Sequence, residues 1–334
     1  AGTINGVGKL VLNENFENRG TITQDEIELA ANKTLTNDAA KSITVNDTLT
    51  NDGTIQKNGI FTVKGENSLG LITDSATPSG TLNLEGTITA DKTVTQKEVN
   101  VNSGSLAVNA LITAGNINNS AAITSSASNL NGAVANKGTL NLTGGTTQGT
   151  IGNYDSTNGI INVSDNLTVA HAITGNTLNL DGAKTLNITT GSLTLAGFTN
   201  DTASSAITTQ NGSIDVVGLG AAALGADLNI SIDAILNAAN VSERADNYTA
   251  TSLTATTNKL VIDSIIARAD STGIYTKAVV ADSVLKDNVG FIGGADSLEL
   301  INGSASVVGT YTARYVTDDN YGYLVIAKAV HNTT

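Results

Sequence analysis

The chain contains 334 residues, with 34 glycines, one proline, no cysteine and only 3% aromatic residues. Its hydrophobic content of 40% argues against a disordered or linker protein, and the lack of cysteine excludes disulfides, thiolate nucleophiles and cysteine-ligated metal sites. The 17 basic and 30 acidic residues give a net charge of −13, which disfavours nucleic acid and anionic lipid as partners. Methionine is absent, also at position 1, which predicts a processed or excised chain.

From the first residues to about residue 216, a short motif recurs in which a turn with Asn and Gly precedes a very short apolar strand. It occurs as Asn18-Arg19-Gly20, Asn51-Asp52-Gly53, Asn136-Lys137-Gly138, Asn158-Gly159 and Asn211-Gly212. Because Asn and Gly both tolerate a positive φ angle, we expect them to turn the chain at these points.

After each turn, apolar residues alternate with polar ones, which is the period of a strand with one buried face. The expected inward pairs are Phe61/Val63, Leu82/Leu84, Val99/Val101, Leu106/Val108, Leu140/Leu142, Ile161/Val163, Leu167/Val169, Leu178/Leu180, Leu186/Ile188, Leu193/Leu195 and Ile214/Val216. Strands this short are unstable as isolated hairpins, so they have to stack on one another.

Short strands, tight corners and an aliphatic interior together predict an all-β protein, a right-handed parallel β-helix over residues 1–216. Because the strand spacing is irregular, we expect coils of about twenty residues with loops of variable length rather than a strict short repeat. Asn lies between the inward residues of five strands, at Asn83, Asn141, Asn162, Asn179 and Asn187. The pleat points these side chains outward, where amide ladders can join one coil to the next.

Residues 217–334 differ in composition and predict a β-rich C-terminal cap or second domain. The apolar run over residues 216–226 is too short to span a bilayer, which takes about 20 residues, and predicts buried packing at a junction. Helical spacing over residues 232–246 predicts one short helix. Two aromatic, β-branched runs around Asp318-Asp319-Asn320 predict a hairpin over residues 310–326.

The two histidines and the aspartates near turns are the residues that could act in catalysis. His171 falls in the inward phase of its strand and His331 lies near the chain end, and neither has a motif partner that would orient a general base. Among the acids near turns, Asp155, Asp165, Asp181 and Asp215 are the ones to consider, because β-helix enzymes acting on polysaccharides use paired carboxylates. Turn aspartates cap their own backbone more often, so no catalytic residue is assigned.

Metal and cofactor sites are also not predicted. Asp38, Asp47, Asp52 and the Asp318-Asp319-Asn320 cluster lack the spacing of known calcium loops. Gly218-Leu219-Gly220 lacks the third glycine of a dinucleotide-binding turn. The sequence therefore gives no metal ligand and no cofactor.

The segments Leu49–Ile55, Asn136–Leu142 and Gly191–Leu195 resemble the β-helical passenger regions of bacterial autotransporter adhesins, a pattern shared with filamentous haemagglutinin-like proteins. The resemblance covers about residues 1–216 and implies an extracellular, surface-displayed stalk, often of Gram-negative bacteria. Residues 217–334 are similar in position and character to the capping segment that precedes the membrane barrel of an autotransporter. The family supplies no catalytic residues that match positions in this sequence.

These observations predict a non-enzymatic bacterial surface protein that mediates adhesion to host or neighbouring cells. Its expected partners are a host receptor, a matrix protein or a glycan, or copies of itself, with no nucleic acid and no membrane insertion within this segment. The alternative is a self-assembling surface-layer subunit, since passengers of this kind also build surface layers. A polysaccharide-degrading β-helix enzyme is the third hypothesis.

Overall fold

The computed structural model describes residues 2–57, 59–235, 238, 240–268, 275–291, 298–302, 305–306 and 311–328. The chain is an all-β, parallel-strand β-solenoid of about 11 turns, which confirms the predicted parallel β-helix. It divides into two compact units, Ala1–Asn162 and Val163–Thr334. We describe each unit separately.

The described residues of the first unit form almost entirely short strands, with a single 3₁₀ turn among them, η1 (Ala127–Asn129). The strands are β1 (Thr3–Asn5), β2 (Lys9–Leu12), β3 (Phe16–Asn18), β4 (Thr21–Leu29), β5 (Thr34–Asn37), β6 (Ser42–Asn51), β7 (Thr54–Lys57), β8 (Ile60–Ser68), β9 (Leu71–Thr73), β10 (Thr81–Ala90), β11 (Val94–Val108), β12 (Ile112–Asn119), β13 (Ala122–Ser125), β14 (Leu130–Asn136), β15 (Thr139–Leu142), β16 (Gly145–Thr146) and β17 (Ile151–Asn153). Strand β18 (Ile160–Val163) crosses the division between the units.

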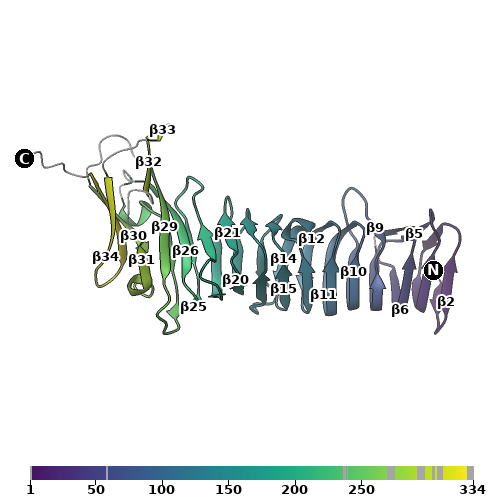
Figure 1. Ribbon diagram of the computed structural model, residues 1–334. Coiled ribbons are helices and arrows are strands. Elements are labelled where there is room, and N and C mark those ends of the chain that lie inside the picture. Colours follow the sequence, from purple (N-terminus) through teal and green to yellow (C-terminus); the bar gives the residue numbers. More distant parts are fainter. Residues whose placement is uncertain are drawn as a thin grey trace, which may run out of the picture. The chain divides into compact units, whose positions relative to one another are not determined.

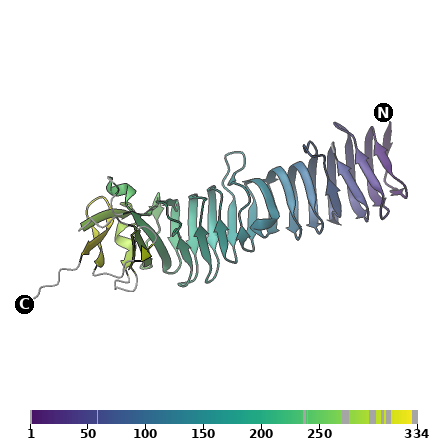
Figure 2. The ribbon, with the colours of Figure 1, turned by 90° about the horizontal axis from the view of Figure 1, so that it is seen from above.

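Successive strands of the first unit pair in parallel, one coil above the next (Figures 1 and 2). One ladder runs β4, β6, β8, β10, and the register places Ile22 beside Ile43, Ile43 beside Phe61 and Phe61 beside Leu82. A second ladder runs β3, β5, β7, β9 on another side of each coil. Side chains that bond between neighbouring coils are 17 to 21 residues apart in sequence, which agrees with the predicted coil length.

The interior of both units is aliphatic, as the alternation predicts. Every expected inward pair from Phe61/Val63 to Leu193/Leu195 is buried, with exposed fractions between 0% and 6%. The exception is Ile214/Val216, where Val216 is 59% exposed and Val217 and Leu219 are the buried residues instead. The prediction was wrong there because strand β24 (Val216–Gly218) is in the opposite phase, with Val217 inward.

Asparagine lies both outside and inside the solenoid. On the outer wall, Asn118 donates to Asn100 at 2.8 Å and Asn100 donates to Asn83 at 3.0 Å, which confirms an outward amide ladder. The sequence did not reveal the inner ladder, in which the corner residues Asn18 and Asn37 are buried and joined by a 2.7 Å hydrogen bond. An inward amide satisfies backbone groups of the next coil that would otherwise be buried without partners.

At Gly212 the φ angle is +86°, as the motif predicts, but the glycines of the Asn-x-Gly corners have a different role from the one expected. Neither Asn136 nor Gly138 has a positive φ angle. A Cβ atom added to Gly138 would lie 2.0 Å from the carbonyl oxygen of Ala121 on the preceding coil, and one at Gly53 would lie 2.3 Å from that of Lys33. Glycine is therefore required at these corners by the close approach of the neighbouring coil rather than by backbone conformation.

The second unit contains further short strands and two 3₁₀ turns, η2 (Val241–Glu243) and η3 (Lys286–Asn288), in the described residues. Its other strands are β19 (Leu167–Val169), β20 (Ile173–Leu180), β21 (Thr185–Ile188), β22 (Leu193–Asn200), β23 (Ala206–Thr208), β25 (Ala221–Leu224), β26 (Leu228–Ile235), β27 (Asn247–Thr249), β28 (Ser252–Leu253), β29 (Leu260–Arg268), β30 (Tyr275–Ala281), β31 (Val289–Phe291), β32 (Leu298–Asn302), β33 (Ala305–Ser306), β34 (Tyr311–Thr317) and β35 (Gly322–Lys328).

Parallel pairing continues past residue 216, where the sequence placed a change of region. Strand β26 pairs in parallel with β23 and β29, and β29 pairs with β32. The helix expected over residues 232–246 is absent from the described part of that range, where β26 runs to Ile235 and η2 is a single 3₁₀ turn. Pairing on both sides of β26 outweighs its local helical spacing.

The end of the second unit changes from parallel to antiparallel pairing. Strands β34 and β35 form the predicted hairpin, and β35 also pairs antiparallel with β30. The hydroxyl of Tyr315 donates to the carbonyl oxygen of Lys286 at 2.6 Å, which ties the hairpin to turn η3. Leu324, Val325 and Ile326 on β35 are buried. The hairpin thus pairs with the edge of β30 that would otherwise be left without a neighbouring strand.

Candidate functional site

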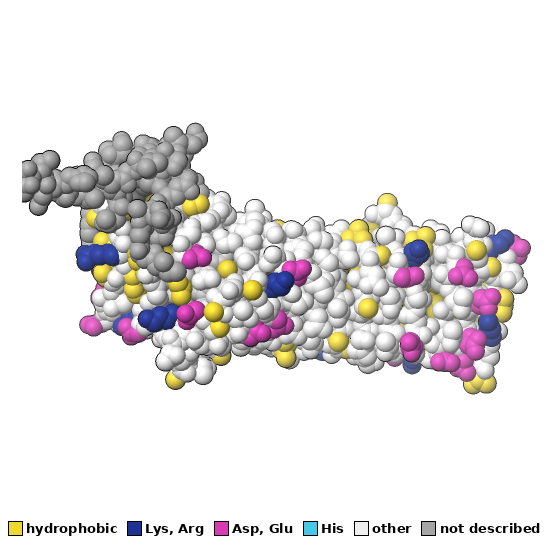
Figure 3. Space-filling view, viewed as in Figure 1, with side chains coloured by type: hydrophobic (Ala, Val, Ile, Leu, Met, Phe, Trp, Pro, Cys, Tyr) yellow, Lys and Arg dark blue, Asp and Glu magenta, His cyan; other side chains and the backbone are white. Residues whose placement is uncertain are grey.

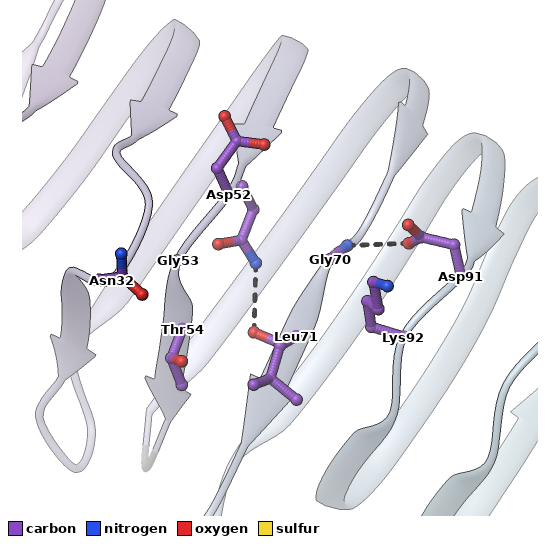
Figure 4. A pocket seen from close by; sticks show the side chains of 9 residues that line it. Asn32, Asp52, Gly53, Thr54, Gly70, Leu71, Asp91 and Lys92 are labelled. Carbon is purple, nitrogen blue, oxygen red and sulfur yellow. Dashed lines mark hydrogen bonds between the residues drawn. The ribbon is translucent and has the colours of Figure 1, made fainter.

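The first unit carries a polar groove on one corner of successive coils (Figure 4). Its volume is about 430 Å³, and it is lined by Asn32, Asn51, Asp52, Gly53, Thr54, Gly70, Leu71, Asp91 and Lys92. These residues come from the last residue of β6, from the loops that follow β4, β6, β8 and β10 and from the first residues of the strands after them. The parallel stacking of the coils therefore places four equivalent corners side by side.

The side chains of this groove are engaged mainly in holding the corners together. The amide of Asn51 donates to the carbonyl oxygens of Leu69 at 2.8 Å and Leu71 at 3.2 Å, and Asp91 accepts from the amide of Gly70 at 3.1 Å. Burial would raise the pKa of Asp91, but hydrogen bonds from Ser68, Gly70 and its own backbone lower it below the ordinary value. The carboxylate is thus ionised at neutral pH and caps a turn.

Asp52, the other acid of the groove, is drawn pointing away from Asp91, and the coil that carries Gly70 lies between them (Figure 4). Equivalent positions two coils apart are separated by about 10 Å in a parallel sheet. That distance is longer than the one that separates the two carboxyl groups of a retaining glycosidase, about 5 Å, and lies just beyond the range of an inverting one, about 6.5–9.5 Å. The groove therefore offers polar surface without an assembled pair of carboxylates.

A buried acidic cluster lies in the second unit around Asp246. Its carboxylate accepts hydrogen bonds from the amides of Asp215 and Asp233 and from the hydroxyl of Thr209. Burial raises the pKa of Asp246 to about 7 even though these three donors oppose the shift. The group is fully buried and does not face a ligand. It joins the turn that precedes β24 to strand β26 through the amides of Asp215 and Asp233.

Two further carboxylates of this cluster also bind backbone or amide groups. Asp233 accepts from the amide of Gly212, and Asp215 accepts from the side chain of Asn211 at 2.7 Å. Burial is the main cause that raises the pKa of Asp215. The sequence did not single out Asp233 or Asp246, because alternation from the inward Ile232 would point Asp233 outward, whereas Ile232, Asp233 and Ala234 are all buried.

The structure moves His171 out of the interior. Strand β19 ends at Val169, and His171 follows it on the exposed surface, so the expected inward position was wrong. The reason is that the inward alternation stops where the strand stops. His331 lies outside the described residues.

Among the turn acids, two form exposed ion pairs. Asp155 lies 2.9 Å from the amine of Lys137, and Asp165 lies 3.1 Å from the amine of Lys184. Asp165 also caps the amide of Asn166 at 2.8 Å, and this bond and Lys184 lower its pKa. Asp165 thus has the capping role that turn aspartates usually have, and Asp155 is engaged by Lys137.

Asp181 has an acidic neighbour on the next coil, Asp201. Loss of hydration and the charge of Asp201 raise the pKa of Asp181, whereas hydrogen bonds from the Gly182 amide and the Thr202 hydroxyl lower the pKa of Asp201. Two carboxyls with oppositely shifted pKa values are what acid–base catalysis uses. Both residues are exposed, and only Asp181 was among the acids that the sequence put forward.

The acids considered for metal binding do not form a metal centre. Within the described residues, no group of three or more His, Asp or Glu side chains is arranged to hold an ion. Asp38 lies 3.9 Å from Arg19, and Asp318 accepts from the amides of Asn320 and Tyr321 at 2.9 Å each. Asp47 accepts a hydrogen bond at its backbone carbonyl from Asn67.

The Gly218-Leu219-Gly220 segment serves packing. Leu219 is fully buried, and Gly220 has a φ angle of +62°. A Cβ atom at Gly220 would lie 2.3 Å from the backbone of Ala196, so the glycine is required by a close approach and by its backbone conformation. Nothing here is shaped to cradle a phosphate.

A second groove, of about 420 Å³, lies on the second unit and is referred to below as the tyrosine groove. It is lined by Val241, Ser242, Asn247, Lys277, Val279, Tyr321 and Tyr323. The rings of Tyr321 and Tyr323 meet edge to face with centroids 6.1 Å apart, and the amine of Lys277 lies 3.6 Å from the centroid of Tyr323. The sequence marked these tyrosines as part of a hairpin but not as the wall of a groove.

Comparisons with known proteins give no relative. No family model matches the chain. No curated protein and no solved structure matches it either. In the described part of the chain, no helix has the length and apolarity needed to cross a bilayer.

Proposed function

We propose that this chain is a non-enzymatic, extracellular β-solenoid stalk of a bacterial surface protein that mediates adhesion. The proposal rests on the outer wall of the coils, where uncharged polar side chains stack from coil to coil. The ladder of the Asn83, Asn100 and Asn118 amides is an example. On the face drawn in Figure 3, the backbone and side chains that are neither charged nor hydrophobic make up most of the surface of the coils, and charged side chains are most frequent toward the N-terminal end. A surface rich in uncharged hydrogen-bonding groups suits contact with another polar surface.

The roles of the carboxylates also favour binding over catalysis. Asp91 and Asp246 cap backbone amides, and Asp155 is held in an ion pair. Asp181 and Asp201 remain as the acids to test for polysaccharide cleavage. If release of reducing ends or unsaturated sugars from a polysaccharide panel is seen and is lost in Asp181→Asn, the chain is an enzyme and the proposal fails.

Self-assembly into a surface layer is the second candidate function. It is favoured by three exposed aliphatic side chains near the start of the first unit, Ile4, Val7 and Val11, of which Val7 is 90% exposed. Exposed apolar side chains are available for contacts with other molecules. Electron microscopy of the purified chain separates the two functions, since ordered two-dimensional sheets indicate a lattice and isolated particles indicate an adhesin.

The experiment that tests adhesion uses beads coated with the whole chain. They are applied to immobilised glycans, to matrix proteins and to cell layers, with beads coated with an unrelated acidic β-protein as the control. Retention on at least one surface above the control is expected. Equal retention of both kinds of bead on every surface would contradict an adhesive role.

A further inference from the structure

We propose that the tyrosine groove binds a neutral saccharide. This inference rests on the proposed adhesive function and names the class of ligand and the site. It requires an aromatic platform held in place, hydrogen-bonding groups around it, and a charge environment that selects against ions. The described residues of the second unit supply each of these.

The platform is held by the turn between β34 and β35. Asp318 accepts hydrogen bonds from the amides of Asn320 and Tyr321, and its own amide donates to the carbonyl oxygen of Tyr321 at 3.0 Å. The hydroxyl of Tyr323 also bonds to Asp318, which raises the pKa of that hydroxyl to about 12. Both rings are therefore fixed before a ligand arrives, which lowers the entropic cost of binding.

The two rings present unequal surfaces. Tyr323 is 8% exposed, and Lys277 lies over its ring, so its main part is to support its neighbour. Tyr321 stands edge to face against it and is 43% exposed. An exposed ring of this kind is a surface on which the C–H groups of a sugar ring pack, because the ring face carries negative electrostatic potential.

Polar groups surround this platform on the other sides of the groove. Ser242 on η2 contributes a hydroxyl, and Asn247 at the start of β27 contributes an amide. The Oδ1 atom of Asn247 has no hydrogen-bond partner in the described part of the chain but is itself shielded from solvent. The groups that this wall can offer are therefore the Ser242 hydroxyl and the rest of the Asn247 amide, and a ligand rich in hydroxyl groups can both donate and accept.

Charge decides which saccharides fit. Lys277 lies 3.8 Å from the carboxylate of Asp318, so its charge is already compensated, and the chain as a whole has a net charge of −13. Acidic sugars are thus repelled over distance. A cationic ligand would have to compete with Lys277 for the aromatic face. The volume of about 420 Å³ falls in the range of about 300–1,000 Å³ that small-ligand pockets have.

The test measures binding of the whole chain to an array of neutral and acidic oligosaccharides, followed by titration with the best neutral one. Tyr321→Ala is expected to weaken binding about tenfold, and Tyr321→Phe, which keeps the ring, is expected to bind like the wild type. The matched control is Tyr154→Ala, because Tyr154 also lies under a lysine, Lys137, at 4.3 Å, but does not line this groove. Thermal unfolding of each variant confirms that the fold is retained.

The outcomes separate this inference from the proposed function. Absence of neutral saccharide binding, a preference for acidic sugars, or binding that Tyr321→Ala leaves unchanged would each overturn the inference. If Tyr321→Ala abolishes saccharide binding and bead adhesion persists, the groove binds saccharide as proposed but adhesion uses another surface. If saccharide binds in the groove and no bead adheres to any surface, the inference stands and the adhesive function fails.

Discussion

The amide of Asn119 donates to the side-chain oxygen of Asn136 at 2.8 Å, and both residues are fully buried. They occupy the same corner of two neighbouring coils, and Asn136 in turn donates to the carbonyl oxygen of Ile160. The interior of the solenoid thus contains a polar ladder beside its aliphatic core. An internal ladder fixes which corner lies above which, because a slipped coil would leave these amides without partners.

Removing one amide of this ladder should destabilise the chain. Asn136→Ala leaves the buried amide of Asn119 without one of its acceptors, which costs about 1–3 kcal/mol for an unsatisfied buried group. We expect a lower midpoint in urea unfolding. The matched control is Asn141→Ala, because Asn141 faces outward in the next strand, where its bonds with Thr124 and Asn162 are not fully buried. Equal midpoints for the two variants would show that the inner ladder does not stabilise the fold.

The corner glycines give a second prediction. Gly138→Ala places a Cβ atom 2.0 Å from the carbonyl oxygen of Ala121, so the coils must move apart, at a cost of about 1–3 kcal/mol for overpacking. The control is Gly8→Ala, where the nearest atom is the flexible side chain of Gln24 at 3.7 Å. Thermal unfolding is expected to fall for the first variant and to stay near the wild-type value for the second. An unchanged midpoint for Gly138→Ala would contradict the close packing of coils.

Asp246 predicts a dependence of stability on pH. Because burial raises its pKa from 3.8 to about 7, the folded chain holds a proton that the unfolded chain releases above pH 3.8. The stabilisation is complete below about pH 4, falls as the pH rises towards 7 and is lost above it. Asp215, whose pKa is also raised, shifts stability in the same direction.

The measurement is the unfolding midpoint of wild type and of Asp246→Asn between pH 4 and 8. Asn keeps the shape of the protonated acid and does not ionise, so the variant should lose less stability across this range. Asp155→Asn serves as the control, since Asp155 is exposed. A wild-type midpoint that rises steadily from pH 4 to 8, or identical curves for wild type and Asp246→Asn, would rule out a titrating buried acid.

The hydrogen bond from Tyr315 predicts how the terminal hairpin is held. Tyr315→Phe removes the bond to the carbonyl oxygen of Lys286 and should cost about 1 kcal/mol, which is typical of one buried hydrogen bond. Faster amide hydrogen exchange is expected in β35 and β30, where the hairpin pairs with the unit. Exchange in β20 to β22 should not change. Unaltered exchange in β35 would mean that the hairpin is held by its strand pairing alone.

The fold was largely predictable because alternation over two residues directly reports which side chains face inward. Pairs such as Leu82/Leu84 are buried for that reason. Alternation is misleading at Val216, because the strand there begins one residue out of phase and nothing in Val216-Val217 distinguishes the two residues. Helical spacing is misleading over residues 232–235, where pairing with neighbouring strands overrides it.

The roles of polar residues were less predictable. Asn136 and Asn141 lie five positions apart, one inward and one outward, and the identity of the residue does not say which amide finds a partner on another coil. The partners are 17 to 21 residues away, and irregular loops hide that spacing. The tyrosine groove could not be predicted for a similar reason. Its residues Ser242, Lys277 and Tyr321 are far apart in sequence and are brought together by the pairing of β27, β30 and β35.

The central claim is that this chain works by holding a polar partner without changing it. The most direct measurement follows chain-coated beads on a surface of labelled neutral glycan under flow and then determines the mass of the glycan by mass spectrometry. The account predicts retention of the beads above bare controls, with the glycan mass unchanged. Failure of the beads to be retained, or a glycan that becomes shorter during contact, would contradict it.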